Sequence, residues 1–268
     1  MKKSVARPLA PLGVDSAKGG VSPFQYLLRL GDDRLVLGHR LSEWCGHGPI
    51  LEEDIALANI ALDLIGQANL LLALAGTVEG KGRDQDALAY FREAVDYRNA
   101  LIVELPNGDF AFTIARQFFF SVFAYLQLEA LQASTDKELA GIAAKGVKEA
   151  KYHVRHSADW MIKLGDGTDE SHRRMQDAVN EIWRYTGELF LSDDVDCAAD
   201  AASVGIDPSK LERPWRAHLD DVLGRATLTV PEVKFMQRGG RMGKHTEHLG
   251  HMLAEMQIVA RSFPDGQW

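Results

Sequence analysis

The stretch from Ile142 to Leu164, IAAKGVKEAKYHVRHSADWMIKL, decides the fold. Its apolar residues recur at steps of three and four, which is the period of a helix with one buried stripe. Ala150 and His153 lie three residues apart on the inward side of this predicted helix. The stretch therefore predicts a core helix. The stripe consists of Ile142, Val147, Ala150, Val154, Ala158, Met161 and Leu164.

The spacing of Ala150 and His153 matches Glu-x-x-His, which di-iron carboxylate bundles place on inward-facing helices. Alanine stands here where the carboxylate would be. A histidine remains at a ligand position without its acidic partner. The pattern indicates a bundle of this kind with an incomplete metal site.

The rest of the chain supports an all-α fold, because few segments alternate with period two. The stretch Leu51 to Gly76 is so apolar that we expect it to be nearly surrounded by protein. The aromatic run from Phe118 to Phe123 is typical of a core or a subunit interface. We predict a helix bundle with additional peripheral helices. The other helices are expected at 22–44, 51–76, 86–101, 109–134, 171–190 and 244–263.

Composition limits the class of protein. The chain has 268 residues, 46% hydrophobic and 25% charged, with a net charge of -8, which argues against non-specific nucleic-acid binding. Cys45 and Cys197 have neither disulfide-framework nor zinc-knuckle spacing. No window approaches the roughly 18 uninterrupted apolar residues of a membrane span. These features predict a cytoplasmic protein without a membrane segment.

Breaks in the helical pattern give the expected organisation. Residues 1–20 are predicted to be a disordered leader, and residues 21–268 one helical domain. The acidic stretch 193–213 is expected to be a loop. Val230 and Pro231 are expected to end a short strand or to form an extended connection.

A dinuclear iron site needs two single carboxylates and two Glu-x-x-His pairs. The second helix offers Asp63 followed by Gly66, and the aromatic helix has phenylalanine where a single glutamate would lie. The central helix offers Ala150 and His153. Too few ligands remain for a dinuclear centre, so we assign no metal-binding residue.

Asp63 is the only charge in the middle of an apolar helix, so we expect it to form an ion pair, with Arg116 or Lys151, rather than to bind metal. His153 is expected to be a hydrogen-bonded core histidine. Glu149 lies one turn before His153, and the two side chains could hold a single metal ion or bond to each other. We favour the hydrogen bond.

The predicted last helix carries a second polar cluster of His245, His248 and His251 with Glu247 and Glu255. A surface zinc site is conceivable, but polar packing against a neighbouring segment is the favoured interpretation. The segment GGRMG, 239–243, does not have the spacing of a triphosphate-binding loop. Its flanking cations could meet an anion or an acidic partner at the helix N-terminus. They are Arg238, Arg241 and Lys244.

Several long motifs, in order and together covering about Tyr26 to Trp268, closely resemble the C subunits of bacterial phenylacetyl-coenzyme A epoxidases, the PaaC family. They are LRLGDDRLVLGHRLSEWCGHGP, ALANIALDLIGQA, ELPNGDFAFTIARQFF, KEAKYHVRHSADWMIKLGDGT and GKHTEHLGHMLAEMQ.

The resemblance implies a ferritin-like structural subunit without cofactor, with a degenerate metal site at Asp63, Gly66, Ala150 and His153. It supplies no catalytic or cofactor-binding residue, so we assign none. It also implies a hetero-oligomer with a homologous catalytic A subunit, which holds the iron and epoxidises the aromatic ring of phenylacetyl-coenzyme A with dioxygen. A separate reductase would supply electrons, and self-association is a further option. The apolar helices would form the interface with the partner. A metal-dependent oxidase acting alone and an acyl-coenzyme A binding module remain alternatives.

Overall fold

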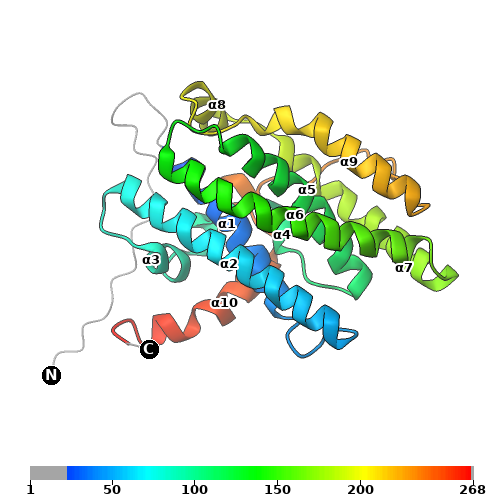
Figure 1. The fold of residues 1–268 in the computed structure, drawn as a ribbon. Helices are drawn as coiled ribbons and strands as arrows, with labels where there is room; N and C mark the ends of the chain where they lie inside the picture. Colours follow the sequence, from blue (N-terminus) through cyan, green and yellow to red (C-terminus); the bar gives the residue numbers. More distant parts are fainter. Residues whose placement is uncertain (1–22, 267–268) are drawn as a thin grey trace.

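The computed structural model describes residues 23–266, and all regular structure in that range is helical. Ten α-helices follow one another there (Figure 1), with 3-10 turns between several of them. The predicted all-α fold is confirmed. The predicted leader, 1–20, lies outside the described residues. The helices are α1 Pro23–Ser42, α2 Leu51–Glu79, α3 Gln85–Tyr90, α4 Leu101–Glu104, α5 Phe110–Leu131, α6 Lys137–Gly165, α7 Asp169–Ile182, α8 Asp194–Ala201, α9 Glu212–Arg225 and α10 Glu247–Ser262.

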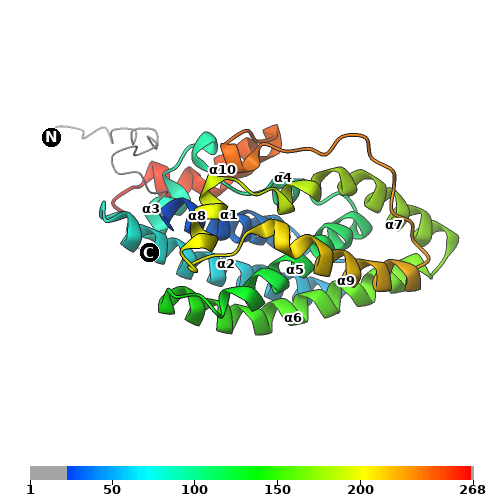
Figure 2. The same ribbon diagram turned by 90° about the horizontal axis from the view of Figure 1, so that it is seen from above.

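Four long helices, α1, α2, α5 and α6, form the central bundle. Helix α1 packs along α2, α5 packs along α6, and α2 also contacts α6. Helices α7 and α9 pack on α5 and α6, whereas α10 contacts α3 and lies on the side of the bundle away from α6 (Figure 2). This arrangement is a ferritin-like bundle with peripheral helices, as predicted.

Local sequence explains where the core helices begin and end. The Asp109 carboxylate accepts a hydrogen bond from the Phe112 N–H at 2.9 Å, and Asp136 accepts one from the Leu139 N–H at 3.0 Å. Such caps satisfy N–H groups that have no partner inside the helix. After α2, Gly80 adopts a φ of 68°, a left-handed conformation that glycine reaches without steric cost.

The aromatic run of α5 lies in the interior of the chain. Phe118, Phe119, Phe120 and Phe123 are each at most 1% exposed. Trp215 of α9 packs against the Phe119 ring and donates its indole N–H to the Phe119 carbonyl at 2.9 Å. These four phenylalanines therefore form part of the core of this chain and are not exposed to another protein.

Helix α2 is not surrounded by protein, contrary to expectation. Ile55, Leu62 and Leu70 are 53%, 67% and 38% exposed. Because they lie seven and eight residues apart, they share one side of the helix. Gly66 lies in the same stripe, with open space where a side chain would be. The helix thus buries its other sides in the bundle and presents an outward apolar stripe, defined here as Ile55, Leu62, Gly66 and Leu70.

Within residues 23–266, α2 is also the one helix long and apolar enough to cross a membrane by length and composition. Half of its most apolar 18-residue window is buried inside the protein. Its polar side chains Glu53 and Gln67 bond to side chains of α6. These contacts hold one side of α2 against α6 in the bundle.

Segment 86–101 is not the single helix that its pattern predicts. After α3 it forms a 3-10 turn at Ala94–Asp96 and extended residues before α4. Asp32 of α1 binds the Arg92 guanidinium, 2.9 Å from Nη1, and accepts the Arg98 backbone N–H at 2.8 Å. Because these buried contacts use groups that a continuous helix would orient differently, tertiary pairing overrides the local helical preference.

Residues 193–213, predicted as a loop, contain α8 and a 3-10 turn at Pro208–Leu211. Asp193 caps α8 by accepting the Val195 N–H at 2.9 Å. Asp193 and Asp196 also bind the Arg29 guanidinium of α1, at 2.8 and 2.5 Å from Nη1. The acidic residues therefore cap and anchor a short helix. Helix α9, which the sequence pattern did not indicate, follows, and residues 230–231 lie in a connection without regular secondary structure, so the strand alternative is not formed.

Candidate functional site: the polar centre of the bundle

Each of the four bundle helices contributes one polar side chain to a network at their centre. The Glu149 carboxylate of α6 accepts a hydrogen bond from Gln67 Nε2 of α2 at 2.9 Å. Gln67 Oε1 in turn accepts one from Arg34 Nε of α1 at 2.9 Å. Arg34 Nη2 donates to Gln127 Oε1 of α5 at 3.3 Å. A ferritin-like bundle places its metal ligands on inward-facing positions of the same four helices.

Arg34 sets the electrostatics of this polar centre. Its side chain is 0% exposed, and burial lowers the pKa of its guanidinium to about 10. Its hydrogen-bond partners are two neutral amides and the Leu30 carbonyl, the last at 2.9 Å from Nη1. A Cβ at position 146 would lie 3.2 Å from Gln67 Cδ, so Gly146 leaves the room that the glutamine occupies.

Asp63 pairs with His153, so the expected pairing with Arg116 or Lys151 is wrong. The distance from His153 Nε2 to Asp63 Oδ2 is 3.0 Å. Arg116 instead binds the Leu105 carbonyl and Asn107 Oδ1, and Lys151 is exposed. The side chain of His153 is 2% exposed and that of Asp63 is 36% exposed. The prediction that His153 is a hydrogen-bonded core histidine is confirmed.

The favoured hydrogen bond between Glu149 and His153 is not formed, because each side chain has a partner on α2 instead. Gly66 faces outward, and Ala150 is 2% exposed in the core. Within residues 23–266, no group of three or more His, Cys, Asp or Glu side chains is placed to hold a metal ion. The structure thus brings Asp63 and His153 together as a pair and leaves Glu149 in the Arg34 network.

The cluster near the last helix is divided by the fold. His245 precedes α10 and binds Glu104, with 2.7 Å from Nδ1 to Oε2, and its Nε2 lies 3.1 Å from the Tyr97 carbonyl oxygen. His248 is half-buried and His251 is exposed. Polar packing against a neighbouring segment is therefore confirmed for His245.

The sequence suggested that the cations around segment 239–243 could meet an anion or an acidic partner. For Arg241 this interpretation is wrong. Arg241 binds Asp33 of α1, with Nη2 2.8 Å from Oδ2 and Nη1 2.9 Å from Oδ1. Its guanidinium serves to dock this segment on α1. Arg238 and Lys244 alone do not form the cluster that the sequence suggests.

Sequence reasoning missed three members of the polar centre, Arg34, Gln67 and Gln127. A signal was available for each. Arg34 is followed by the apolar run Leu35 to Leu37, and both glutamines lie in apolar runs, where a polar residue needs an interior partner. Amides and guanidinium groups are not ligands of dinuclear iron sites, so a pattern of metal ligands does not include them.

The sequence model of phenylacetic acid catabolic proteins matches residues 17–268. The chain belongs to this family. The C subunit of the 1,2-phenylacetyl-CoA epoxidase of Escherichia coli strain K12 is 49% identical over 243 residues, which are 91% of this chain and 98% of that protein. The resemblance inferred from the motifs is confirmed.

In this phenylacetic acid catabolic protein, the polar centre does not fit a dinuclear iron site. Two irons are held by several carboxylates and imidazoles in proteins of this architecture. The centre offers one carboxylate, Glu149, together with two amides and a guanidinium. A guanidinium has only N–H donors and no lone pair for a metal.

Proposed function

We propose that this chain is a structural subunit of a cytoplasmic phenylacetyl-CoA epoxidase complex of phenylacetate degradation. It would support the catalytic A subunit, which binds the iron, while a reductase component supplies electrons. The family and the 49% identical epoxidase relative support the assignment to this complex. The observation that carries the structural role is the buried Arg34 cation at the centre of the four-helix network.

Arg34 opposes metal binding through charge as well as through its donor groups. Two like charges a few ångströms apart repel strongly inside a protein, where the effective dielectric constant is low. The guanidinium therefore disfavours a second cation at the polar centre, and its hydrogen bonds to Gln67 and Gln127 occupy the amide oxygens there.

Chain purified alone is expected to contain far less than one iron, manganese or zinc ion per molecule. Elemental mass spectrometry after incubation with iron(II) and desalting measures this. The complex with the catalytic partner, treated in the same way, is the control and is expected to carry iron from the partner. Stoichiometric iron in the isolated chain would contradict the structural role and favour the oxidase alternative.

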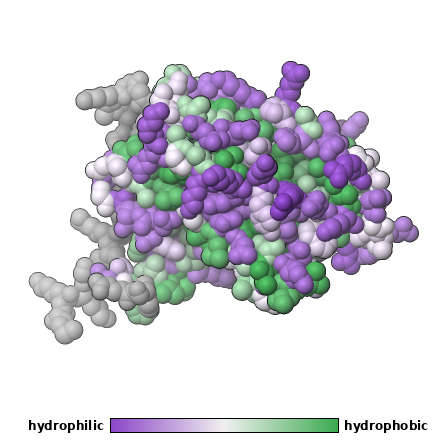
Figure 3. Space-filling view, in the orientation of Figure 1, coloured by the Kyte–Doolittle hydropathy of each residue, from purple (hydrophilic) through white to green (hydrophobic). Residues whose placement is uncertain are grey.

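The outward apolar stripe of α2 is the surface that we assign to the catalytic partner. Hydrophobic surface lies over α2 near its N-terminal end in Figure 3. Leu62 at 67% and Ile55 at 53% exposure are large apolar side chains in water, an unfavourable situation unless a partner covers them. The open space at Gly66 lets the backbone of a partner helix approach closely.

Leu62→Arg is expected to weaken binding of the catalytic partner by roughly 30-fold or more, because it places an unpaired charge in the centre of an apolar contact. Co-purification and surface plasmon resonance with the partner measure the effect. Ile258→Arg, at a position of similar exposure (61%) on α10, is the matched control and should bind as wild type does. If Ile258→Arg weakened binding and Leu62→Arg did not, the interface would lie on α10.

A further inference from the structure

A groove on the outside of the bundle is lined by aromatic and basic side chains. It lies between α5, α6 and α9, is open to solvent and has a volume of about 500 Å³. This volume is within the range of small-molecule sites. Nothing in the polar centre or the α2 stripe uses it. The lining residues are Tyr125, Lys148, Lys151, Tyr152, Val154, Arg155 and His218.

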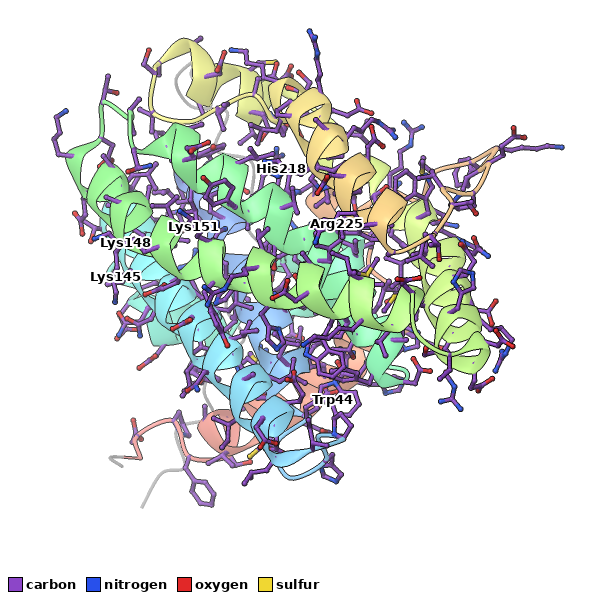
Figure 4. The ribbon with its side chains drawn as sticks, turned by 45° about the vertical axis from the view of Figure 1, so that its right-hand side comes forward. Trp44, Lys145, Lys148, Lys151, His218 and Arg225 are labelled. Carbon is purple, nitrogen blue, oxygen red and sulfur yellow. The ribbon has the colours of Figure 1, made fainter. Side chains whose placement is uncertain are left out.

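Three cations, Lys148, Lys151 and Arg155, line the groove although the chain carries a net charge of -8. Lys145, Lys148 and Lys151 follow one another along the exposed side of α6 at three-residue steps, and His218 of α9 lies across from them (Figure 4). Among residues 23–266 none of these three lysines has an ion-pair partner.

Exposed cations of this chain differ in their pairing: among residues 23–266, Lys137, Arg184 and Arg213 are without an ion-pair partner, as the three lysines are, whereas other cations are neutralised. Arg173, Arg216 and Arg225 each pair with a carboxylate of their own helix. Ammonium groups left unpaired and close together repel one another, and an anionic ligand removes that cost. Because Lys148, Lys151 and Arg155 line the same groove, they favour a ligand with more than one negative charge.

The two tyrosines give the groove its aromatic walls. Tyr152 is 38% exposed, and the Arg155 guanidinium lies 5.6 Å from its ring centroid. On the facing side, the Tyr125 and His218 rings meet edge to face at 6.4 Å. Tyr125 donates its hydroxyl to Glu129 at 3.0 Å, which holds the ring in place. Aromatic faces beside cations suit a planar base attached to phosphates.

We propose that this groove binds a phosphorylated adenine nucleotide, with the base against Tyr125 and Tyr152 and the phosphates on Lys148, Lys151 and Arg155. The inference rests on the proposed function, under which the complex acts on a coenzyme A thioester. The nucleotide end of coenzyme A carries adenine, a diphosphate and a 3′-phosphate. Free nucleotides such as ADP share the base and the diphosphate, so the experiment must separate the two sources.

Isothermal titration of the full chain with coenzyme A, dephospho-coenzyme A and ADP tests the proposal. Saturable binding of coenzyme A is expected, about tenfold tighter than dephospho-coenzyme A, because the 3′-phosphate adds a charge-assisted contact. If ADP binds as tightly as coenzyme A, the groove is still a nucleotide site, but its ligand is a free nucleotide and not coenzyme A. Lack of saturable binding of all three at millimolar concentration would overturn the proposal.

Variants locate the binding in the groove. Lys148→Gln with Lys151→Gln is expected to weaken coenzyme A binding at least tenfold. Lys137→Gln is the matched control, since Lys137 is exposed on the same helix about 16 Å before Lys148. Tyr152→Ala should weaken binding whereas Tyr152→Phe, which keeps the ring, should not. Equal weakening by the Lys137 variant would overturn the assignment. Circular dichroism checks the fold of each variant.

Two further measurements separate nucleotide binding from binding of an acidic protein segment, and from the proposed function. Binding of poly-glutamate that depends on Lys148 and Lys151, without nucleotide binding, would show that the surface recognises an acidic protein segment and would overturn the nucleotide proposal. Co-purification of the same double variant with the catalytic partner is measured separately. A wild-type chain that joins the complex but binds no nucleotide would refute the groove and leave the proposed function intact.

Discussion

Replacing Asp32 with asparagine is expected to lower the free energy of unfolding by about 3–5 kcal/mol, because it leaves a buried guanidinium without its counter-charge. Asp32 is 0% and Arg92 is 2% exposed, and both oxygens of Asp32 bind the Arg92 guanidinium. Asparagine keeps one acceptor oxygen but removes the negative charge. Urea denaturation followed by circular dichroism measures the loss.

Glu170→Gln is the control for this prediction, because it breaks exposed contacts with Arg173 and Arg174 and should leave the unfolding midpoint unchanged. A second variant, Asp32→Asn with Arg92→Met, is expected to recover part of the loss, since no unpaired buried charge remains. If Asp32→Asn unfolds at the wild-type midpoint, the pair does not hold segment 86–101 on α1.

Trp215→Ala is expected to destabilise the chain by about 3–5 kcal/mol, since it leaves a large cavity between α5 and α9. Trp215 is 0% exposed, and its ring lies 5.0 Å from the Phe190 ring and 5.8 Å from the Trp183 ring. The substitution also leaves the Phe119 carbonyl without the indole donor. Urea denaturation again gives the free energy of unfolding.

Trp44→Ala is the comparison, because Trp44 is only partly buried, with its indole N–H 3.0 Å from Thr113 Oγ1. Its loss of stability should be clearly smaller than that of Trp215→Ala. Equal losses would mean that Trp215 does not hold α9 on the aromatic core.

Helical periodicity was enough to predict most of the central bundle. The expected helices at 22–44, 51–76 and 109–134 correspond to α1, α2 and α5 with ends displaced by at most three residues. Periodic apolar stripes and aspartate caps act over neighbouring residues, so they can be read locally. The central stretch 142–164 falls inside α6, which begins earlier, at Lys137, after the Asp136 cap.

The peripheral segments were harder to predict for a physical reason. Segment 86–101 and helices α8 and α9 depend on Asp32, Arg29 and Trp215 contacts with distant parts of the chain. Short helices have little stability of their own and take their shape from what they pack against. Their sequences therefore carry too little local signal.

The sequence by itself determined the helical class and the family motifs, since each follows from which residues are present and how they are spaced. Only the tertiary structure decided which side chains meet. Asp63 and His153 are ninety residues apart, and their pairing depends on how α2 packs on α6. The Arg34 network likewise needs four helices at once. Partner choice in a core is set by packing across helices, which the local sequence does not specify.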